Sequence, residues 1–133
     1  MELTLQAFST QKLESVLEKD INLVACHSDY SEGLKSIEVN KASVVLVEHD
    51  EKNADFEQLL KGIRDKSPES KIILLGEGIS DEVILRYILC GIYGYLQLSC
   101  INEFLNKSIK CVHQGEAWFS RKLVSSLIES VRA

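Results

Sequence analysis

The chain has 133 residues, of which 45% are hydrophobic and 26% are charged, a composition typical of one globular domain. A domain of this length buries roughly two thirds of the surface that its unfolded chain exposes, and a second domain does not fit. The formal net charge is −5 and the basic residues form no cluster, so we expect this domain not to grip nucleic acid by itself.

No apolar run approaches the roughly 20 residues that a membrane-spanning helix needs. The segment Met1 to Thr4 lacks a basic stretch followed by an apolar one. Cys26, Cys90, Cys100 and Cys111 form no CxxC pair, which favours reduced thiols over a disulfide or a zinc site. We therefore expect a cytoplasmic protein that does not bind a membrane.

Apolar runs typical of strands alternate with helical patterns, as expected for βα units around a parallel sheet. The strand-like runs are 3–8, 21–26, 43–47, 71–75 and 94–98. Between the first two runs, Leu13, Val16 and Leu17 recur at helical spacing after a cap at Ser9 or Thr10. This spacing predicts a first helix there.

Apolar residues at helical spacing predict five more helices. Their apolar stripes are Tyr30, Leu34 and Ile37; Phe56, Leu59, Leu60 and Ile63; Val83 to Cys90; Ile101 to Val112; and Leu123 to Val131. Ser28 and Ser80 are the predicted caps of the first and third of these. The second is expected to stop near Pro68, because the residue before a proline resists helical dihedrals.

Three residues follow three of the predicted strands. Glu48 follows the strand at 43–47, Gly76 follows the strand at 71–75, and Leu98 ends the last strand. In an open parallel sheet the ligand crevice lies outside the carboxyl ends of the strands. The sequence therefore predicts the functional site at these three residues.

Two short motifs resemble a known family. Residues 91–96 read GIYGYL and residues 115–120 read GEAWFS. They are similar to the start of strand five and to the segment after helix five in receiver domains of two-component response regulators, in particular the LuxR/NarL-type transcription regulators. The resemblance implies an α/β fold that is receiver-like (flavodoxin-like). It consists of a doubly wound five-stranded parallel sheet with strand order 2-1-3-4-5, and an extra C-terminal helix follows.

The resemblance also assigns positions. Glu48 lies where the family has its phosphoacceptor Asp, Gly76 where it has Thr or Ser, and Leu98 where it has Lys. Residues 7–9 replace the acidic pair at the end of strand one, and only the switch aromatic, Tyr95, is kept. Phosphorylation needs a cation held by carboxylates, an Asp nucleophile, a hydroxyl and an ammonium. We therefore expect an atypical pseudo-receiver that is not an enzyme, with no catalytic residue, metal or cofactor.

Glu48 has two interpretations. Its carboxylate, one methylene longer than that of Asp, is a built-in mimic of an aspartyl phosphate, or it is a polar strand end with no partner left to feel its charge. Next to it, His49, Asp50, Glu51 and Asp55 form either a metal cluster or a solvated acidic loop, and the loop is favoured.

The helix at 83–90 is apolar around more of its circumference than one buried stripe requires. We therefore expect a contact face at Ile84, Tyr87, Ile88 and Tyr93, which meets a protein partner or a second copy in a homodimer. In the alternative, the last helix folds back and covers this face.

The predicted organisation is a receiver-like domain over 1–118 and a C-terminal helix over 119–133, which is a possible linker to an absent output domain. The predicted function is that of a non-phosphorylatable receiver domain of a response regulator. It would regulate transcription by protein contacts or dimerisation and would reach DNA only through another domain, attached or supplied by a partner. The alternative is a stand-alone adaptor or small-ligand-sensing module on the same fold.

Overall fold

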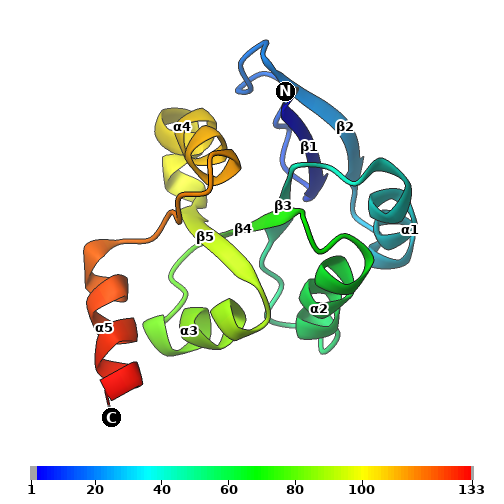
Figure 1. Ribbon diagram of the computed structural model, residues 1–133. Helices are drawn as coiled ribbons and strands as arrows, with labels where there is room; N and C mark the ends of the chain where they lie inside the picture. Colours follow the sequence, from blue (N-terminus) through cyan, green and yellow to red (C-terminus); the bar gives the residue numbers. More distant parts are fainter. Residues whose placement is uncertain (1–2, 133) are drawn as a thin grey trace.

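The computed structural model describes residues 3–132, which form a central parallel sheet with helices on both faces (Figure 1). The strand order is β2-β1-β3-β4-β5, so the predicted sheet is confirmed. The strands are β1 (Leu3–Phe8), β2 (Ile21–His27), β3 (Val44–Glu48), β4 (Lys71–Gly76) and β5 (Ile92–Gln97). The helices are α1 (Tyr30–Asn40), α2 (Phe56–Lys66), α3 (Asp81–Leu89), α4 (Ile101–His113) and α5 (Arg121–Arg132), and a short 3-10 turn, η1 (Leu98–Cys100), precedes α4.

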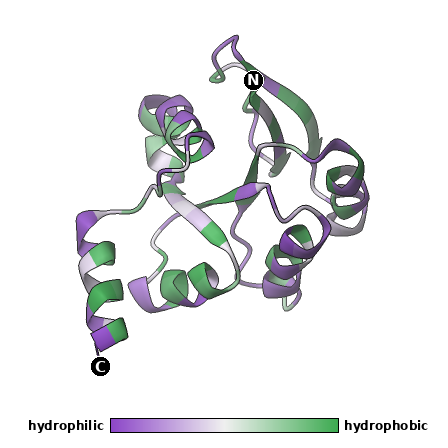
Figure 2. Ribbon diagram, viewed as in Figure 1, coloured by the Kyte–Doolittle hydropathy of each residue, from purple (hydrophilic) through white to green (hydrophobic). Residues whose placement is uncertain are grey.

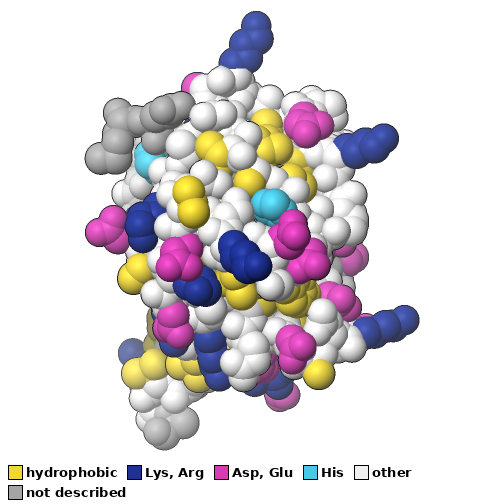
Figure 3. Space-filling view, turned by 90° about the vertical axis from the view of Figure 1, so that its right-hand side faces the viewer, with side chains coloured by type: hydrophobic (Ala, Val, Ile, Leu, Met, Phe, Trp, Pro, Cys, Tyr) yellow, Lys and Arg dark blue, Asp and Glu magenta, His cyan; other side chains and the backbone are white. Residues whose placement is uncertain are grey.

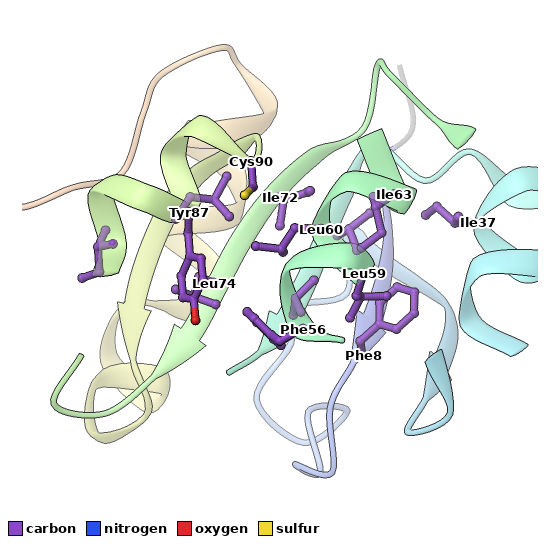
Figure 4. Packing of buried hydrophobic residues seen from close by; sticks show 14 of the residues in the cluster. Phe8, Ile37, Phe56, Leu59, Leu60, Ile63, Ile72, Leu74, Tyr87 and Cys90 are labelled. Atoms are coloured by element: carbon purple, nitrogen blue, oxygen red, sulfur yellow. The ribbon is translucent and has the colours of Figure 1, made fainter. Parts of the chain in front are cut away.

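The core has two layers, one on each face of the sheet. Helices α1, α2 and α3 cover one face, where aromatic and aliphatic side chains interlock (Figure 4). Helix α4 covers the other face. The central strand β3 sends Val45 and Val47 into the first layer and Val44 and Leu46 into the second. Burial on both faces explains why this strand reads as a continuous apolar run.

The first predicted helix does not form, and residues 9–20 make a series of turns between β1 and β2. Only one turn is helical, where the backbone N–H groups of Val16 and Leu17 donate to the carbonyl of Leu13 at 3.0 and 3.1 Å. A single turn fixes several dihedral angles for little hydrogen bonding, so it does not propagate without further support. Here the side chain of Asn106 on α4 takes over that bonding. Its Nδ2 donates to the Val16 carbonyl at 2.9 Å, and its Oδ1 accepts from the Glu18 N–H at 2.8 Å.

The turns nevertheless cover the sheet as a helix would. Leu13 is 2% exposed, and Val16 and Leu17 are partly buried against the layer under α4. The Nζ of Lys110 on α4 pairs with Glu18 and, at 3.1 Å, with Asp20. The apolar spacing of Leu13, Val16 and Leu17 therefore reflects the burial of their side chains. The turns bury these side chains without forming a helix.

The helix caps follow the sequence with one correction. The Oγ of Ser80 accepts from the Val83 N–H at 3.4 Å, as predicted for α3. Helix α1 is capped by Asp29 rather than by Ser28, because the Asp29 carboxylate accepts from the Glu32 N–H at 3.2 Å.

Trp118 attaches the C-terminal segment to the edge of the sheet. Its carbonyl accepts from the Tyr95 N–H at 2.8 Å, and its N–H donates to the Tyr93 carbonyl at 3.2 Å. Gly94 permits this approach, since a Cβ there would lie 3.0 Å from the Trp118 Cβ. Trp118 packs on the α4 side and Phe119 on the α3 side of the sheet. This anchor positions the start of α5.

Helix α5 lies beside α3 at the outside of the molecule (Figure 1). Among its residues only Leu123 is buried, so α5 covers little of α3. Hydrophobic residues nevertheless recur along α5 (Figure 2). Within 3–132, no helix combines the length and the apolarity needed to cross a bilayer.

Candidate functional site

The three residues of the predicted site lie at one edge of the sheet. Glu48 ends β3, Gly76 ends β4, and Leu98 begins η1 directly after β5. Because the three strands are parallel neighbours, their carboxyl ends meet at the same edge.

The Glu48 carboxylate is held by the end of β1. It accepts hydrogen bonds from the Ser9 Oγ at 2.8 Å, from the Thr10 N–H at 3.2 Å and from the Thr10 hydroxyl at 3.4 Å. Ser9 is itself 7% exposed, and its Oγ also accepts from the Gln11 N–H at 3.0 Å. The interpretation of Glu48 as a strand end without a partner is therefore wrong. Its partners come from the segment where the sequence lacks the acidic pair.

Adjoining hollows lie at this edge of the sheet. A small hollow of about 230 Å³ is lined by Glu48, Ser9 and Thr10, among others. A larger hollow of about 640 Å³ is lined by Gly76 and Leu98. Its charged lining is mixed and consists of Asp50, Glu51, Glu77, Lys52 and Arg86. The two hollows meet at His49 and Asp50, which line both.

The end of the Ile79 side chain fills the space that a side chain at Gly76 would take. A Cβ at this position would lie 2.5 Å from the Ile79 Cδ1 and 3.2 Å from the His49 Cβ. A hydroxyl-bearing residue at position 76 would therefore require Ile79 to move.

His49 connects the site to α3, which the sequence analysis missed. Its Nε2 lies 2.9 Å from the hydroxyl oxygen of Tyr87, and its ring packs edge-on against Phe56 with centroids 5.1 Å apart. Phe56 on α2 and Tyr87 on α3 point toward the sheet (Figure 4), and their ring centroids are 5.3 Å apart. His49 and Tyr87 are 38 residues apart in the sequence, so no local sequence pattern predicts their contact.

Burial among these rings lowers the pKa of His49 below 6.5, because an apolar surrounding disfavours the charged imidazolium. The carboxylates of Glu51 and Asp50 oppose this shift of the pKa, and the Arg86 guanidinium reinforces it. Arg86 in turn pairs with Glu57 of α2, with its Nε 2.5 Å from the carboxylate oxygen.

Tyr95 is half-buried on β5 and packs against the layer under α3. Burial raises the pKa of its hydroxyl, and a hydrogen bond with the Ile79 backbone opposes that rise. The aromatic ring thus lies beside the same Ile79 that fills the space next to Gly76.

Comparison with known proteins identifies the fold. No established family profile matches the chain. Two solved structures match almost its whole length at a TM-score of 0.79, a LuxR-family two-component response regulator from Aurantimonas sp. SI85-9A1 at 14% identity and the isolated receiver (REC) domain of RcsB from Salmonella enterica serovar Typhimurium at 18%. The first covers 98% of this chain and 97% of that chain, and the second 96% and 98%. This chain has the receiver fold.

The receiver fold is also found in the signal receiver domain of the NarL response regulator of Mycobacterium tuberculosis. It matches at a TM-score of 0.75 and 16% identity over 86% of this chain and 98% of that chain. In sequence, the present chain is 26% identical over 112 residues to the oxygen regulatory protein NreC of Staphylococcus aureus. That match covers 84% of this chain and 52% of NreC, so the chain spans about half the length of the curated relatives it matches.

The contact face predicted from the sequence needs a correction. Ile84 is 2% exposed and Tyr87 is 4% exposed, so both face the core and cannot provide a docking surface. Ile88 and Tyr93 are partly buried, while Leu89 at the end of α3 is 80% exposed. The exposed apolar surface of α3 thus centres on Leu89, because Tyr87 turns inward to meet His49.

Charged side chains of both signs are interspersed on the face of the molecule that carries α1 and α2 (Figure 3). Among residues 3–132, no three His, Cys, Asp or Glu side chains gather closely enough to hold a metal ion. His49, Asp50, Glu51 and Asp55 therefore form no ligand set, since His49 is instead engaged with Tyr87.

Proposed function

We propose that this chain is an atypical receiver domain of a LuxR/NarL-type response regulator, which regulates transcription without being phosphorylated. The receiver fold and the sequence similarity to NreC support the family. DNA contact would come from another domain, attached or supplied by a partner, because this domain is acidic.

The observation that carries the proposal is the hydrogen bonding of Glu48. Phosphoryl transfer to a receiver needs a divalent cation at the end of β1 and β3, and Mg²⁺ requires several oxygen ligands in octahedral geometry. In this chain Ser9 and Thr10 hold the Glu48 carboxylate instead. Ser9 and Thr10 are uncharged, so they do not supply the negative charge that an acidic pair would offer the cation, and Glu48 is the one carboxylate among these three residues.

The second support is the environment of the transferred group. A phosphoryl group needs a donor and a counter-charge, each worth about 1.5 to 3 kcal/mol as a charged hydrogen bond. Gly76 and Leu98 supply neither, and Ile79 occupies the space that a hydroxyl at position 76 would need. The Glu48 carboxylate accepts hydrogen bonds from Ser9 and Thr10, so we favour a structural role for it over a phosphate mimic.

Without phosphorylation, the domain would act through protein contacts. The surface that we assign to this role is formed by Ile88 and Leu89 on α3, because Tyr93 packs against the layer under α4 on the other side of the sheet. It would bind a protein partner or a second copy, and the segment 119–133, to which α5 belongs, would link the receiver-like domain over 1–118 to the output module. Exposed apolar area of this kind is typical of an interface.

The test is the intact mass of the protein after incubation with Mg²⁺ and acetyl phosphate. We expect no phosphoryl adduct on the wild type and none on Glu48→Asp, because the shorter carboxylate still lacks the cation ligands. The control is a variant with Ser9→Asp, Glu48→Asp, Gly76→Ser and Leu98→Lys, which restores the missing groups together. An adduct on Glu48 in the wild-type protein would refute the proposal.

One observation favours the alternative of a small-ligand sensor or adaptor. The hollow of about 640 Å³ beside Gly76 and Leu98 is large enough for a metabolite and carries charges of both signs. Native mass spectrometry of the freshly purified protein tests this alternative. A bound small molecule that is lost on Leu98→Trp, which would fill the hollow, would favour the sensor.

A further inference from the structure

Helix α5 turns an apolar surface away from the rest of the molecule. Four of its hydrophobic side chains are exposed: Val124 at 42%, Leu127 at 36%, Ile128 at 47% and Val131 at 79%. Only Leu123 packs into the core, where it is 3% exposed. The helix is thus fixed to the body along one edge, and most of its apolar side has no cover within residues 3–132.

The exposed residues have the spacing of a helix that docks against another helix. Positions 124, 127, 128 and 131 are related as i, i+3, i+4 and i+7, which places them on one side over two turns. This is the arrangement of anchors in helix-in-groove recognition. We call these four residues the α5 stripe.

The charges beside the α5 stripe indicate the chemistry of its partner. Arg121 lies seven residues before Ile128 and Arg132 lies four residues after it, so both basic side chains border the stripe on the Ile128 side. The one acidic residue of the helix, Glu129, lies three residues before Arg132 and therefore neighbours it on the helix surface. Helix α5 therefore carries a formal charge of +2 in a chain whose net charge is −5.

A second copy of the chain fits this border poorly. Two α5 helices packed stripe to stripe would bring Arg121 and Arg132 of both copies to one interface. The carboxylate of Glu129 offsets only part of this charge, and each helix keeps a formal charge of +2. Two helices of the same net charge repel each other, which opposes association. A partner with carboxylates along the border of its own apolar stripe that meets the Ile128 side would pair with both arginines instead.

We propose that the α5 stripe binds an amphipathic helix of another protein, whose apolar stripe is bordered by Asp or Glu side chains. This surface is separate from the surface around Leu89, and the proposal does not depend on whether Glu48 is phosphorylated. Apolar burial supplies the affinity, and the paired charges select the partner and its orientation.

The test uses two fluorescein-labelled synthetic helical peptides with leucines at identical positions. One has Glu and the other has Lys on both sides of the leucine stripe. Fluorescence anisotropy measures their binding to the 133-residue chain. We expect the acidic peptide to bind at least tenfold more tightly than the basic one, and its binding to weaken as salt is added.

Variants locate the site. Ile128→Glu should abolish binding of the acidic peptide, and Arg121→Glu with Arg132→Glu should reverse the preference between the peptides. Val39→Glu is the matched control, because it places the same charge on an apolar position of α1 that is 82% exposed, and it should leave binding unchanged. Ile128 is half exposed, so the thermal melt of Ile128→Glu should follow the wild type.

Three results would overturn the proposal. The first is equal binding of the two peptides or binding of neither, and the second is unchanged binding by Ile128→Glu. The third is a concentration-dependent dimer in sedimentation velocity that Ile128→Glu dissociates, which would make a second copy the occupant. A dimer lost on Leu89→Glu alone would instead report on the surface around Leu89 and would leave the peptide result as the test of α5.

Discussion

Two stretches of this chain build the same sheet in different ways. From β2 to β5, each strand is followed by a helix that returns to the start of the next strand. From β1 to β2, a series of turns makes the return, and polar side chains stabilise it from outside the segment. Glu48 at the end of β3 and Asn106 on α4 accept or donate the hydrogen bonds that a helix would satisfy internally. The difference teaches that a βα unit can lose its helix if neighbouring elements supply partners.

The largest expected effect on stability comes from truncating one buried leucine in each stretch. Leu105 on α4 is 0% exposed and Leu13 in the turns is 2% exposed. We expect Leu105→Ala to lower the free energy of unfolding by about 2 to 5 kcal/mol. Leu13→Ala should cost less, because a loop without helical bonds can collapse into the space left behind. Urea unfolding of the two variants measures both, and equal losses would mean that the turns are as rigid as α4.

The sequence was sufficient to predict the units from β3 to α4, because their apolar periods coincide with complete elements. Phe56, Leu59, Leu60 and Ile63 are all buried, as their spacing predicts. The spacing of Leu13, Val16 and Leu17 reports the same need for burial, but periodicity cannot tell a helix from a loop that buries the same side chains.

The site was only partly predictable for a different reason. The strand ends at Glu48, Gly76 and Leu98 follow from the order of elements. The partners of Glu48 lie 38 and 39 residues away, and the contact of His49 with Tyr87 spans 38 residues. Such contacts depend on the packing of whole elements, which no local pattern encodes.

The second effect concerns Asn106, which ties the turns to α4. Asn106→Ala leaves the Val16 carbonyl and the Glu18 N–H without this partner, and we expect a loss of about 1 to 3 kcal/mol in stability. Hydrogen exchange should accelerate in residues 11–20 and stay unchanged in β3 and β4. The control is Asn102→Ala, an exposed position on the same helix. Uniform acceleration across the sheet would contradict a local role for Asn106.

The third effect concerns the hydrogen bond between Ser9, directly after β1, and Glu48 at the end of β3. Ser9→Ala removes the hydrogen bond of 2.8 Å to Glu48, and we expect a loss of about 1.5 kcal/mol, since a charged acceptor strengthens the bond. A double-mutant cycle with Glu48→Gln isolates the coupling between the two side chains. Additive losses in the cycle would show that Ser9 stabilises the turn through Gln11 instead of holding Glu48.

The smallest expected effect is the pH dependence that His49 gives to the free energy of unfolding. Burial lowers the pKa of His49 below its unfolded value of 6.5, so the unfolded chain binds more protons there than the folded one. The resulting stability is present above the unfolded pKa and is lost as the pH falls through the folded pKa. Proton NMR titration should place the pKa of His49 below 6.5, and His49→Gln should flatten the pH dependence of urea unfolding between neutral and mildly acidic pH. Tyr87→Phe separates the causes, because it removes the hydroxyl 2.9 Å from Nε2 and keeps the ring. A pKa that stays low in Tyr87→Phe assigns the shift to burial, and a pKa that returns to the ordinary value assigns it to the hydrogen bond.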